Sequence, residues 1–304
     1  MISIPLSPSP SSFSGYDMTI STAMANLLYG ITIGSTYALI SCGLTIILGV
    51  MGVLNFAHGS FVMLGAYTGY TIVKLTGNFW LSFFLSPLVI ALLAGIMEKF
   101  MVSRLYGKEV LFTLLLTFGM GMVFANAVLL IWGGSPYSIQ LPYYFKGFVN
   151  LFGLYYPKFR LFVLFFSFLL VTFIWIFLNR SRWGLVIRAG LFDIETVQAF
   201  GINIYKVFNV LFLCCAGIAA VAGVIIGAMR SINPVMDADF ITVAVIVIVI
   251  GGLGSFKGAV IGSLILGLAE SFGAQAIPGL AKFTTWAIMA AVLLLRPEGL
   301  FPER

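Results

Sequence analysis

The chain has 304 residues, of which 61% are hydrophobic and only 9% are charged, and its mean hydropathy is +1.11. An ordinary soluble domain carries about 25% charged residues, so this composition excludes a large soluble core and indicates a polytopic membrane protein. The formal net charge of +6 does not indicate nucleic-acid binding, because no basic cluster has aromatic neighbours outside the apolar runs. The preference of Lys and Arg for cytoplasmic loops explains the charge.

The N-terminal segment has no membrane-spanning character. Its first sixteen residues are rich in Ser and Pro and contain neither Lys nor Arg, whereas a secretory signal begins with a basic segment. We therefore expect a disordered tail over residues 1–23 and a first hydrophobic helix that is retained. The apolar runs that predict helices fall at about 24–41, 42–54, 59–73, 79–97, 110–132, 161–178, 207–228, 240–252, 259–273 and 283–295.

These runs predict an all-α membrane protein with about 8–10 apolar helical segments, discontinuous helices among them, arranged as two pseudo-repeated halves. The transmembrane domain is expected over residues 24–296, followed by a C-terminal tail at 297–304. Charge does not decide the side of the N-terminus, because residues 1–23 carry a single charged residue, Asp17. If each pair of short segments dips into the membrane and returns, both termini are cytoplasmic, and this is the arrangement we expect.

Residues 49–65 place polar groups in the middle of apolar sequence. Asn55 and His58, the one histidine of the chain, stand there among several glycines. An unsatisfied polar group inside a bilayer costs several kcal/mol, so such an interruption is tolerated only inside protein or beside a water-filled cavity. The preceding run, 42–54, is shorter than the about 20 residues that a helix needs to cross. We expect a broken helix here, an element from which many transporters build a pathway.

The second half of the chain holds a similar interruption. The run 240–252 is again short, and it continues through a Gly-rich stretch into a second apolar piece that ends at Glu270. Short Gly-interrupted segments in two halves point to a pathway at a repeat interface. The alternative is that these glycines only allow close helix packing. The residues that we expect to line a pathway are Asn55, His58, Gly59, Gly251, Gly252, Gly254 and Glu270.

No motif for catalysis, nucleotide binding or metal binding stands in the sequence. The stretch from Gly251 to Gly258 fails the phosphate-loop pattern, and one histidine cannot form a His-Glu-x-x-His site. We therefore expect no catalytic residues, no metal and no cofactor bound by this chain. Secondary transport usually needs ionisable groups inside the spans, and only His58 and Glu270 approach that description. Each of them has a structural hydrogen bond as its alternative role.

The segment 180–206 is the longest charged stretch of the chain. The excess of Lys and Arg on its side of the membrane makes that side cytoplasmic. Leu191, Ile194 and Val197 are three apart, which places them on one face of a short helix that Gly201 ends. Such a helix fits either docking of a soluble partner or an interfacial position on lipid.

Several short motifs occur in an order that is similar to one family of transport proteins. The chain resembles the integral-membrane permease subunits of bacterial ABC importers for branched-chain amino acids over about residues 24–301. The motifs are Ser35-Thr36-Tyr37-Ala38-Leu39, Asn55-Phe56-Ala57-His58-Gly59, Arg188-Ala189, Gly201-Ile202-Asn203, Gly217-Ile218-Ala219-Ala220-Val221-Ala222-Gly223, Gly251-Gly252-Leu253-Gly254-Ser255 and Arg296-Pro297-Glu298-Gly299-Leu300.

The resemblance implies a multi-pass protein of the bacterial cytoplasmic (inner) membrane that works within a complex. Its partners would be a second homologous permease subunit, two cytoplasmic ATP-binding subunits and an extracytoplasmic substrate-binding protein. ATP would be bound by those partner subunits, and the lipid bilayer would surround the chain. Segment 180–206 would then be the coupling segment, with ATPase contacts from Arg188, Leu191, Asp193, Ile194, Val197 and Gly201.

The resemblance leaves the substrate open. Related permeases serve leucine-type amino acids, and others serve urea or short amides, so an ABC permease for urea is the alternative. A self-sufficient secondary transporter is the remaining rival. The chain departs from many relatives at Phe192 and at Val197-Gln198 of the coupling segment, which bears on the particular ATPase that it accepts.

Overall fold

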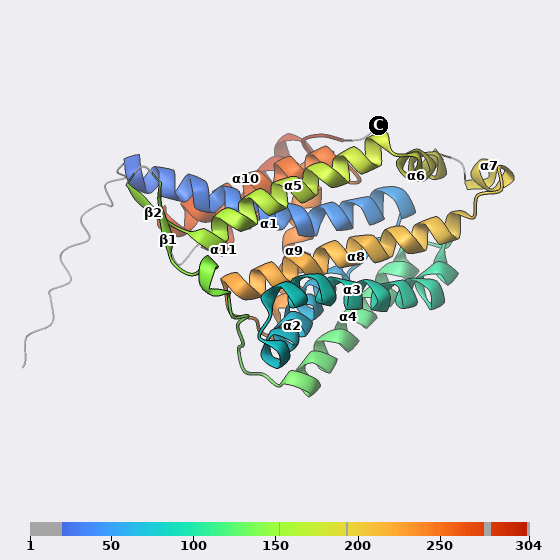
Figure 1. The fold of residues 1–304 in the computed structure, drawn as a ribbon. Coiled ribbons are helices and arrows are strands. Elements are labelled where there is room, and N and C mark those ends of the chain that lie inside the picture. The colour runs from blue at the N-terminus through green and yellow to red at the C-terminus, as the bar shows by residue number, and fades with distance from the viewer. Residues whose placement is uncertain (1–19, 152, 193, 277–280, 303–304) are drawn as a thin grey trace, which may run out of the picture.

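The computed structural model describes residues 20–151, 153–192, 194–276 and 281–302, and these residues are almost entirely helical. Two short antiparallel strands, β1 (Phe148–Leu151) and β2 (Leu154–Pro157), form a hairpin at one end of the bundle (Figure 1). The helices are α1 (Ile20–Met51), α2 (His58–Thr76), α3 (Phe79–Phe100), η1 (Val102–Leu105), α4 (Val110–Trp132), η2 (Tyr143–Phe145), α5 (Lys158–Arg180), α6 (Arg182–Phe192), α7 (Ile194–Ala199), α8 (Ile204–Met229), α9 (Met236–Gly251), α10 (Phe256–Ala276) and α11 (Ala281–Leu295).

Six of the described helices are long and apolar enough to cross a membrane, and these segments confirm the prediction of an all-α polytopic protein. A shorter apolar helix follows at Phe283–Leu295. In Figure 1 the long helices run between the hairpin at one end and α6 and α7 at the other. The six segments are Thr22–Met51, Phe79–Leu105, Val110–Trp132, Lys158–Arg180, Ile204–Met229 and Phe256–Gln275.

The first two predicted runs are one helix. Runs 24–41 and 42–54 belong to α1, which is continuous for 32 residues, so the prediction that they are two separate segments is wrong. The prediction judged the length of run 42–54 by itself, although this run continues run 24–41 in one helix. Since α1 begins at Ile20, the predicted tail 1–23 overlaps it, and residues 1–19 lie outside the described residues.

The interruption predicted within 49–65 is confirmed as the link 52–57, which brings the chain back into the bundle before α2 begins. The His58 Nε2 atom lies 3.0 Å from the carbonyl oxygen of Ile40, in the middle of α1. Gly59 packs against the first turn of α9, because a Cβ atom there would lie 2.2 Å from the Asp237 carbonyl oxygen. Helices α2 and α9 therefore begin beside each other inside the bundle.

The start of α1 lies at the hairpin end. The Thr32 Oγ1 and Tyr156 Oη atoms form a 2.7 Å hydrogen bond, and the rings of Tyr29 and Tyr156 lie 5.1 Å apart. Segments α6 and α7 lie at the opposite end of α5 (Figure 1). The prediction of an N-terminus on the same side as segment 180–206 is therefore wrong. It assumed that 24–41 and 42–54 dip and return, whereas α1 crosses once.

Small residues let the central helices approach backbone to backbone, as is common between membrane helices. A Cβ atom on Gly267 of α10 would lie 2.2 Å from the Gly34 nitrogen of α1. A Cβ atom on Gly223 of α8 would lie 2.0 Å from the Val62 carbonyl oxygen of α2. These contacts join α1, α2, α8 and α10 into one core.

Replacing Gly267 by Val tests this packing. The added side chain meets backbone atoms of α1, which cannot rotate away. The free energy of unfolding of the variant should therefore fall by at least about 1–3 kcal/mol, the typical cost of overpacking. Thermal unfolding of the purified protein in detergent measures the change. The matched control is Gly119→Val in α4, where an added Cβ meets nothing within 4 Å. Equal melting temperatures for the two variants would contradict the close α1–α10 contact.

Candidate functional site

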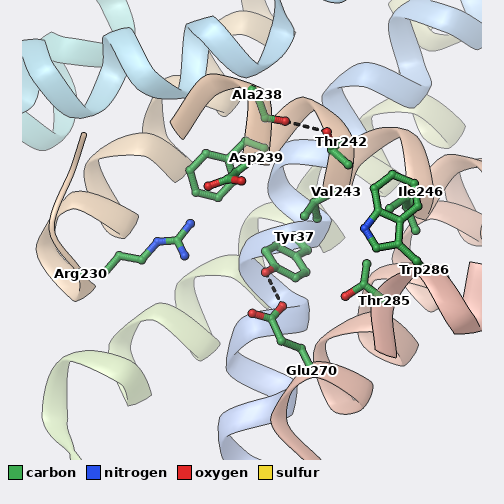
Figure 2. Close-up of a pocket in the computed structure, with 11 residues that line it drawn as sticks. Tyr37, Arg230, Ala238, Asp239, Thr242, Val243, Ile246, Glu270, Thr285 and Trp286 are labelled. Carbon is green, nitrogen blue, oxygen red and sulfur yellow. Dashed lines mark hydrogen bonds between the residues drawn. The ribbon is translucent and has the colours of Figure 1, made fainter. Parts of the chain in front are cut away.

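A cavity of about 310 Å³ lies between α1, α9, α10 and α11, and it is called the outer cavity below (Figure 2). Arg230 borders it directly after the end of α8. Because α8 runs from the α7 end to the hairpin end, the outer cavity lies in the half of the bundle that faces the hairpin. Its lining residues are Tyr37, Arg230, Ala238, Asp239, Phe240, Thr242, Val243, Ile246, Glu270, Thr285 and Trp286.

Glu270 is held in the wall of the outer cavity by a tyrosine. The Tyr37 hydroxyl donates a hydrogen bond of 2.5 Å to Glu270 Oε2, and Figure 2 shows the two side chains meeting across α1 and α10. Tyr37 is buried, so the hydrogen bond fixes the carboxylate. Glu270 thus has the structural hydrogen bond that the sequence left open, and it also lines the outer cavity, while its place in a pathway stays a prediction.

Arg230 brings a cation to the same cavity. Its guanidinium carbon lies 4.8 Å from the centroid of the Phe240 ring, a cation–π contact with a buried side chain. Figure 2 shows the Arg230 side chain reaching from the end of α8 toward Asp239 and Tyr37. The contact with Phe240 holds the guanidinium over the opening of the cavity.

Asp239 supplies a second carboxylate from the first turn of α9, which also contains Asp237. The backbone N–H groups at the start of a helix favour negative charge, so both positions stabilise the beginning of α9 inside the bundle. The Ser60 hydroxyl of α2 donates to Asp237 Oδ2 at 3.4 Å, while Asp239 borders the outer cavity.

The remaining wall of the outer cavity is apolar. Val243 and Ile246 come from α9, and Trp286 of α11 stands opposite Arg230 in Figure 2. The site therefore combines one cationic group, two carboxylates and an aliphatic and aromatic surface. Such a site suits non-covalent binding of a small molecule with both polar and apolar parts.

The predicted residues of the first interruption lie elsewhere. Asn55 and His58 are fully buried where α2 begins. The Asn55 Oδ1 atom accepts a hydrogen bond from the Ala57 N–H, and the His58 Nε2–H group donates to the Ile40 carbonyl. Gly59 lies against α9. These residues contact protein and not the outer cavity, which is the structural role that the sequence left open for His58.

The three predicted glycines of the second interruption lie at the far end of α9. Gly251 packs against Gly258, and Gly254 packs against Gly49 of α1. A Cβ atom on Gly252 would lie 2.9 Å from the carbonyl oxygen of Phe301. The C-terminal residues close this end, because the Phe301 N–H donates to the Gly251 carbonyl. The seven predicted pathway residues thus fall in three separate places, and a pathway role for the glycines stays a prediction.

Sequence reasoning predicted only Glu270 of the outer cavity, and the polar and aromatic residues that it missed include Tyr37, Arg230, Asp239 and Trp286. A signal for two of them was present. Arg230 and Asp239 stand within ten residues of each other, directly before the short apolar run 240–252. Charges at the start of a run that is too short to cross mark a helix that begins within the membrane.

The predicted coupling segment contains the two short helices α6 and α7, which lie at the end opposite the hairpin (Figure 1). Gly201 has φ +79° and its N–H donates to the Gln198 carbonyl, which confirms the predicted end of the helix. Val197 is buried and packs into the hydrophobic core, so its side chain does not present the surface that the predicted ATPase contact needs. Arg188 donates a hydrogen bond to the Leu178 carbonyl at the end of α5.

The other predicted contacts of the coupling segment cannot be placed on a face. Asp193 and the side chains of Leu191 and Ile194 lie outside the described residues. Sequence reasoning missed Phe200, whose side chain is 81% exposed directly after α7. An aromatic residue exposed to that extent beside a helix end is a candidate for partner contact.

Comparison with known proteins decides the family. Residues 26–295 match the family model described as "Branched-chain amino acid transport system / permease component". The chain belongs to this family of permeases. Together with the six spanning helices, family membership places it in the cytoplasmic membrane as a multi-pass protein.

Curated relatives match over almost their full length. The high-affinity branched-chain amino acid transport system permease protein BraD of Pseudomonas aeruginosa is 32% identical, over 91% of this chain and 95% of that protein. The corresponding permease protein LivH of Escherichia coli K12 is 32% identical, over 91% and 94%. Among solved structures, PsaBC from Streptococcus pneumoniae in complex with Fab has a TM-score of 0.47 and 13% identity, covering 91% of this chain and 92% of that chain.

The hydrogen bond of His58 yields a prediction about pH. Because His58 is buried and donates to a backbone carbonyl, its role is structural, and His58→Gln keeps a donor in that place. The variant should therefore show the uptake rate of the unaltered protein and the same dependence on external pH. Uptake measured between acidic and neutral pH checks this. A changed pH profile in the variant would mean that His58 titrates during transport.

Proposed function

We propose that the chain is the membrane-spanning permease subunit of an ATP-driven importer for branched-chain amino acids. The observation that carries the proposal is the family match over residues 26–295, together with relatives at 32% identity whose names state this transport system. The fold supports it with a charged cavity facing the hairpin end and two short helices at the opposite, cytoplasmic end.

The proposed complex contains a second homologous permease, two cytoplasmic ATP-binding subunits and an extracytoplasmic substrate-binding protein. The sequence between Gly251 and Gly258 lacks a phosphate-loop motif, so we assign ATP binding to the partner subunits. Exposed apolar faces of α4 and α5, with residues such as Leu130 and Phe168, are available for lipid or for the second permease.

We further propose that α6 and α7 couple the ATPase subunits to the membrane helices. The segment is fixed by α5 on one side and by α8 on the other, so a displacement of α7 moves both spans. The Arg188 bond to the Leu178 carbonyl ties α6 to the end of α5. Phe200 is the exposed side chain that we assign to a cleft of the ATPase.

Urea or a short amide is the alternative cargo, and the outer cavity argues against it. Urea carries no charge, whereas the cavity presents Arg230, Asp239 and Glu270. A zwitterion gains charge-assisted hydrogen bonds to such side chains, whereas urea offers them no opposite charge. An importer for a charged or zwitterionic molecule is therefore the better fit.

Reconstitution tests the proposed function directly. Proteoliposomes that contain the chain, its second permease and the ATPase subunits should accumulate labelled leucine when ATP and the binding protein are supplied. The chain reconstituted alone should not accumulate leucine in a proton or sodium gradient. Gradient-driven uptake by the chain alone would contradict the importer and support a secondary transporter, and uptake of urea in place of leucine would support the alternative cargo.

Phe200→Asp tests the coupling contact. In the proposed complex the ATPase cleft buries the Phe200 side chain. Its replacement removes about 1.5–3 kcal/mol of apolar binding free energy, and the new carboxylate opposes burial in the cleft. The variant should retain little ATPase on co-purification and should lose uptake, while its own thermal stability is unchanged. The matched control is Phe148→Asp, which alters another exposed phenylalanine on the hairpin at the opposite end. Undiminished ATPase binding by Phe200→Asp would show that the contact lies elsewhere.

A further inference from the structure

We infer that the outer cavity is a binding site for the two charged ends of one free α-amino acid. Arg230 binds the carboxylate, Asp239 and Glu270 bind the ammonium group, and Val243, Ile246 and Trp286 contact the aliphatic side chain. The inference rests on the proposed function and assigns the residues that recognise its substrate within the membrane.

The three charges come from three separate parts of the fold. Arg230 follows α8, Asp239 belongs to the first turn of α9, and Glu270 lies on α10. Figure 2 shows all three around one space, with Tyr37 hydrogen-bonded to Glu270. Arg230 and Asp239 are close in sequence because α9 begins shortly after the end of α8, and Glu270 joins them because α10 packs against α9.

The arrangement selects a zwitterion over a singly charged ligand. A guanidinium presents N–H donors in a planar fork that matches a carboxylate. On the facing wall Tyr37 occupies Glu270 Oε2, and Oε1 remains an acceptor for an ammonium group. A ligand with one charge contacts one side of the site only, so it gains fewer charge-assisted hydrogen bonds than a zwitterion.

Size and lining limit the ligand further. A cavity of about 310 Å³ is near the lower end of the range for ligand pockets, about 300–1,000 Å³, so it suits a single amino acid. Ile246, in the middle of α9, is buried and gives the cavity part of its apolar lining. Trp286 is half exposed at the rim, where an aliphatic side chain can cover it.

The depth of the site indicates the direction of entry. The cavity lies in the hairpin half of the bundle, and residues of α9 beyond it, such as Ile248 and Ile250, are buried. A substrate therefore enters from the hairpin side and stops above this packed region. The described conformation is thus open to the outside and closed toward α6 and α7.

Binding of labelled leucine to the purified full-length chain, in the millimolar range, tests the inference. The competitors are 4-methylpentanoate, which lacks the ammonium group, and 3-methylbutylamine, which lacks the carboxylate. The unaltered chain should bind leucine, and each competitor should displace it at least tenfold less well than unlabelled leucine. Arg230→Gln should weaken leucine binding by about ten- to hundredfold, the effect of losing a charge-assisted pair, and should leave 3-methylbutylamine binding unchanged.

The control is Arg160→Gln, because Arg160 lies at the same end of the bundle, stacked on Tyr29, and outside the cavity. Leucine binding by this variant should equal that of the unaltered chain. The site would be overturned if Arg230→Gln bound leucine with the affinity of the unaltered chain. It would also be overturned if the unaltered chain bound no leucine although its complex imports leucine. Failure of the complete complex to import leucine would instead overturn the proposed function, so the two failures are distinguishable.

Discussion

The structure depends on one constraint, the need to satisfy the backbone of two helices that begin inside a membrane protein. The first backbone N–H groups of a helix have no partner within it, and a bilayer offers no water to replace one. Helix α2 meets the constraint with Asn55, which accepts from the Ala57 N–H, and with Thr117 of α4, which accepts from the Phe56 N–H at 3.1 Å. Helix α9 meets it with Asn233, which accepts from the Val235 N–H, and with acidic residues in its first turn.

These two beginnings explain the positions of small and charged residues. The helices meet where Gly59 contacts the Asp237 carbonyl, and no larger residue fits that approach. Asp239, one of the two carboxylates in the first turn of α9, also lines the outer cavity. In this account, Asp239 serves the backbone of α9 and the ligand together, so folding and recognition share one side chain.

Much of the fold follows from apolar length, and the sequence predicts nearly every helix to within a few residues. The errors have one origin. The apolar character of a run alone does not show where along the bundle a helix begins or ends. Runs 24–41 and 42–54 were separated although α1 joins them, and the side of the N-terminus was misassigned as a result. Glycine patterns indicated interruption, but the structure uses Gly251 and Gly254 for packing contacts. The division into two pseudo-repeated halves stays a prediction.

The candidate site was less predictable than the fold, because its residues come from four helices and from a link. Glu270 was expected in a pathway from its place in an apolar run, and it does line the outer cavity. Tyr37 and Trp286 resemble ordinary membrane aromatics in the sequence, and only the packing of α1, α10 and α11 reveals them. In the coupling segment, periodicity assigned Val197 outward, although it packs inward and Phe200 is the exposed residue.

The central claim is that the outer cavity opens to the outside while Phe200 faces the cytoplasm. Single cysteines in a background with Cys42, Cys214 and Cys215 replaced by Ala test it most directly. In intact cells a membrane-impermeant thiol reagent should label Thr242→Cys in the outer cavity and leave Phe200→Cys unmodified, whereas permeabilised cells should show labelling of both. Labelling of Phe200→Cys in intact cells, with Thr242→Cys protected, would contradict the orientation and the site together.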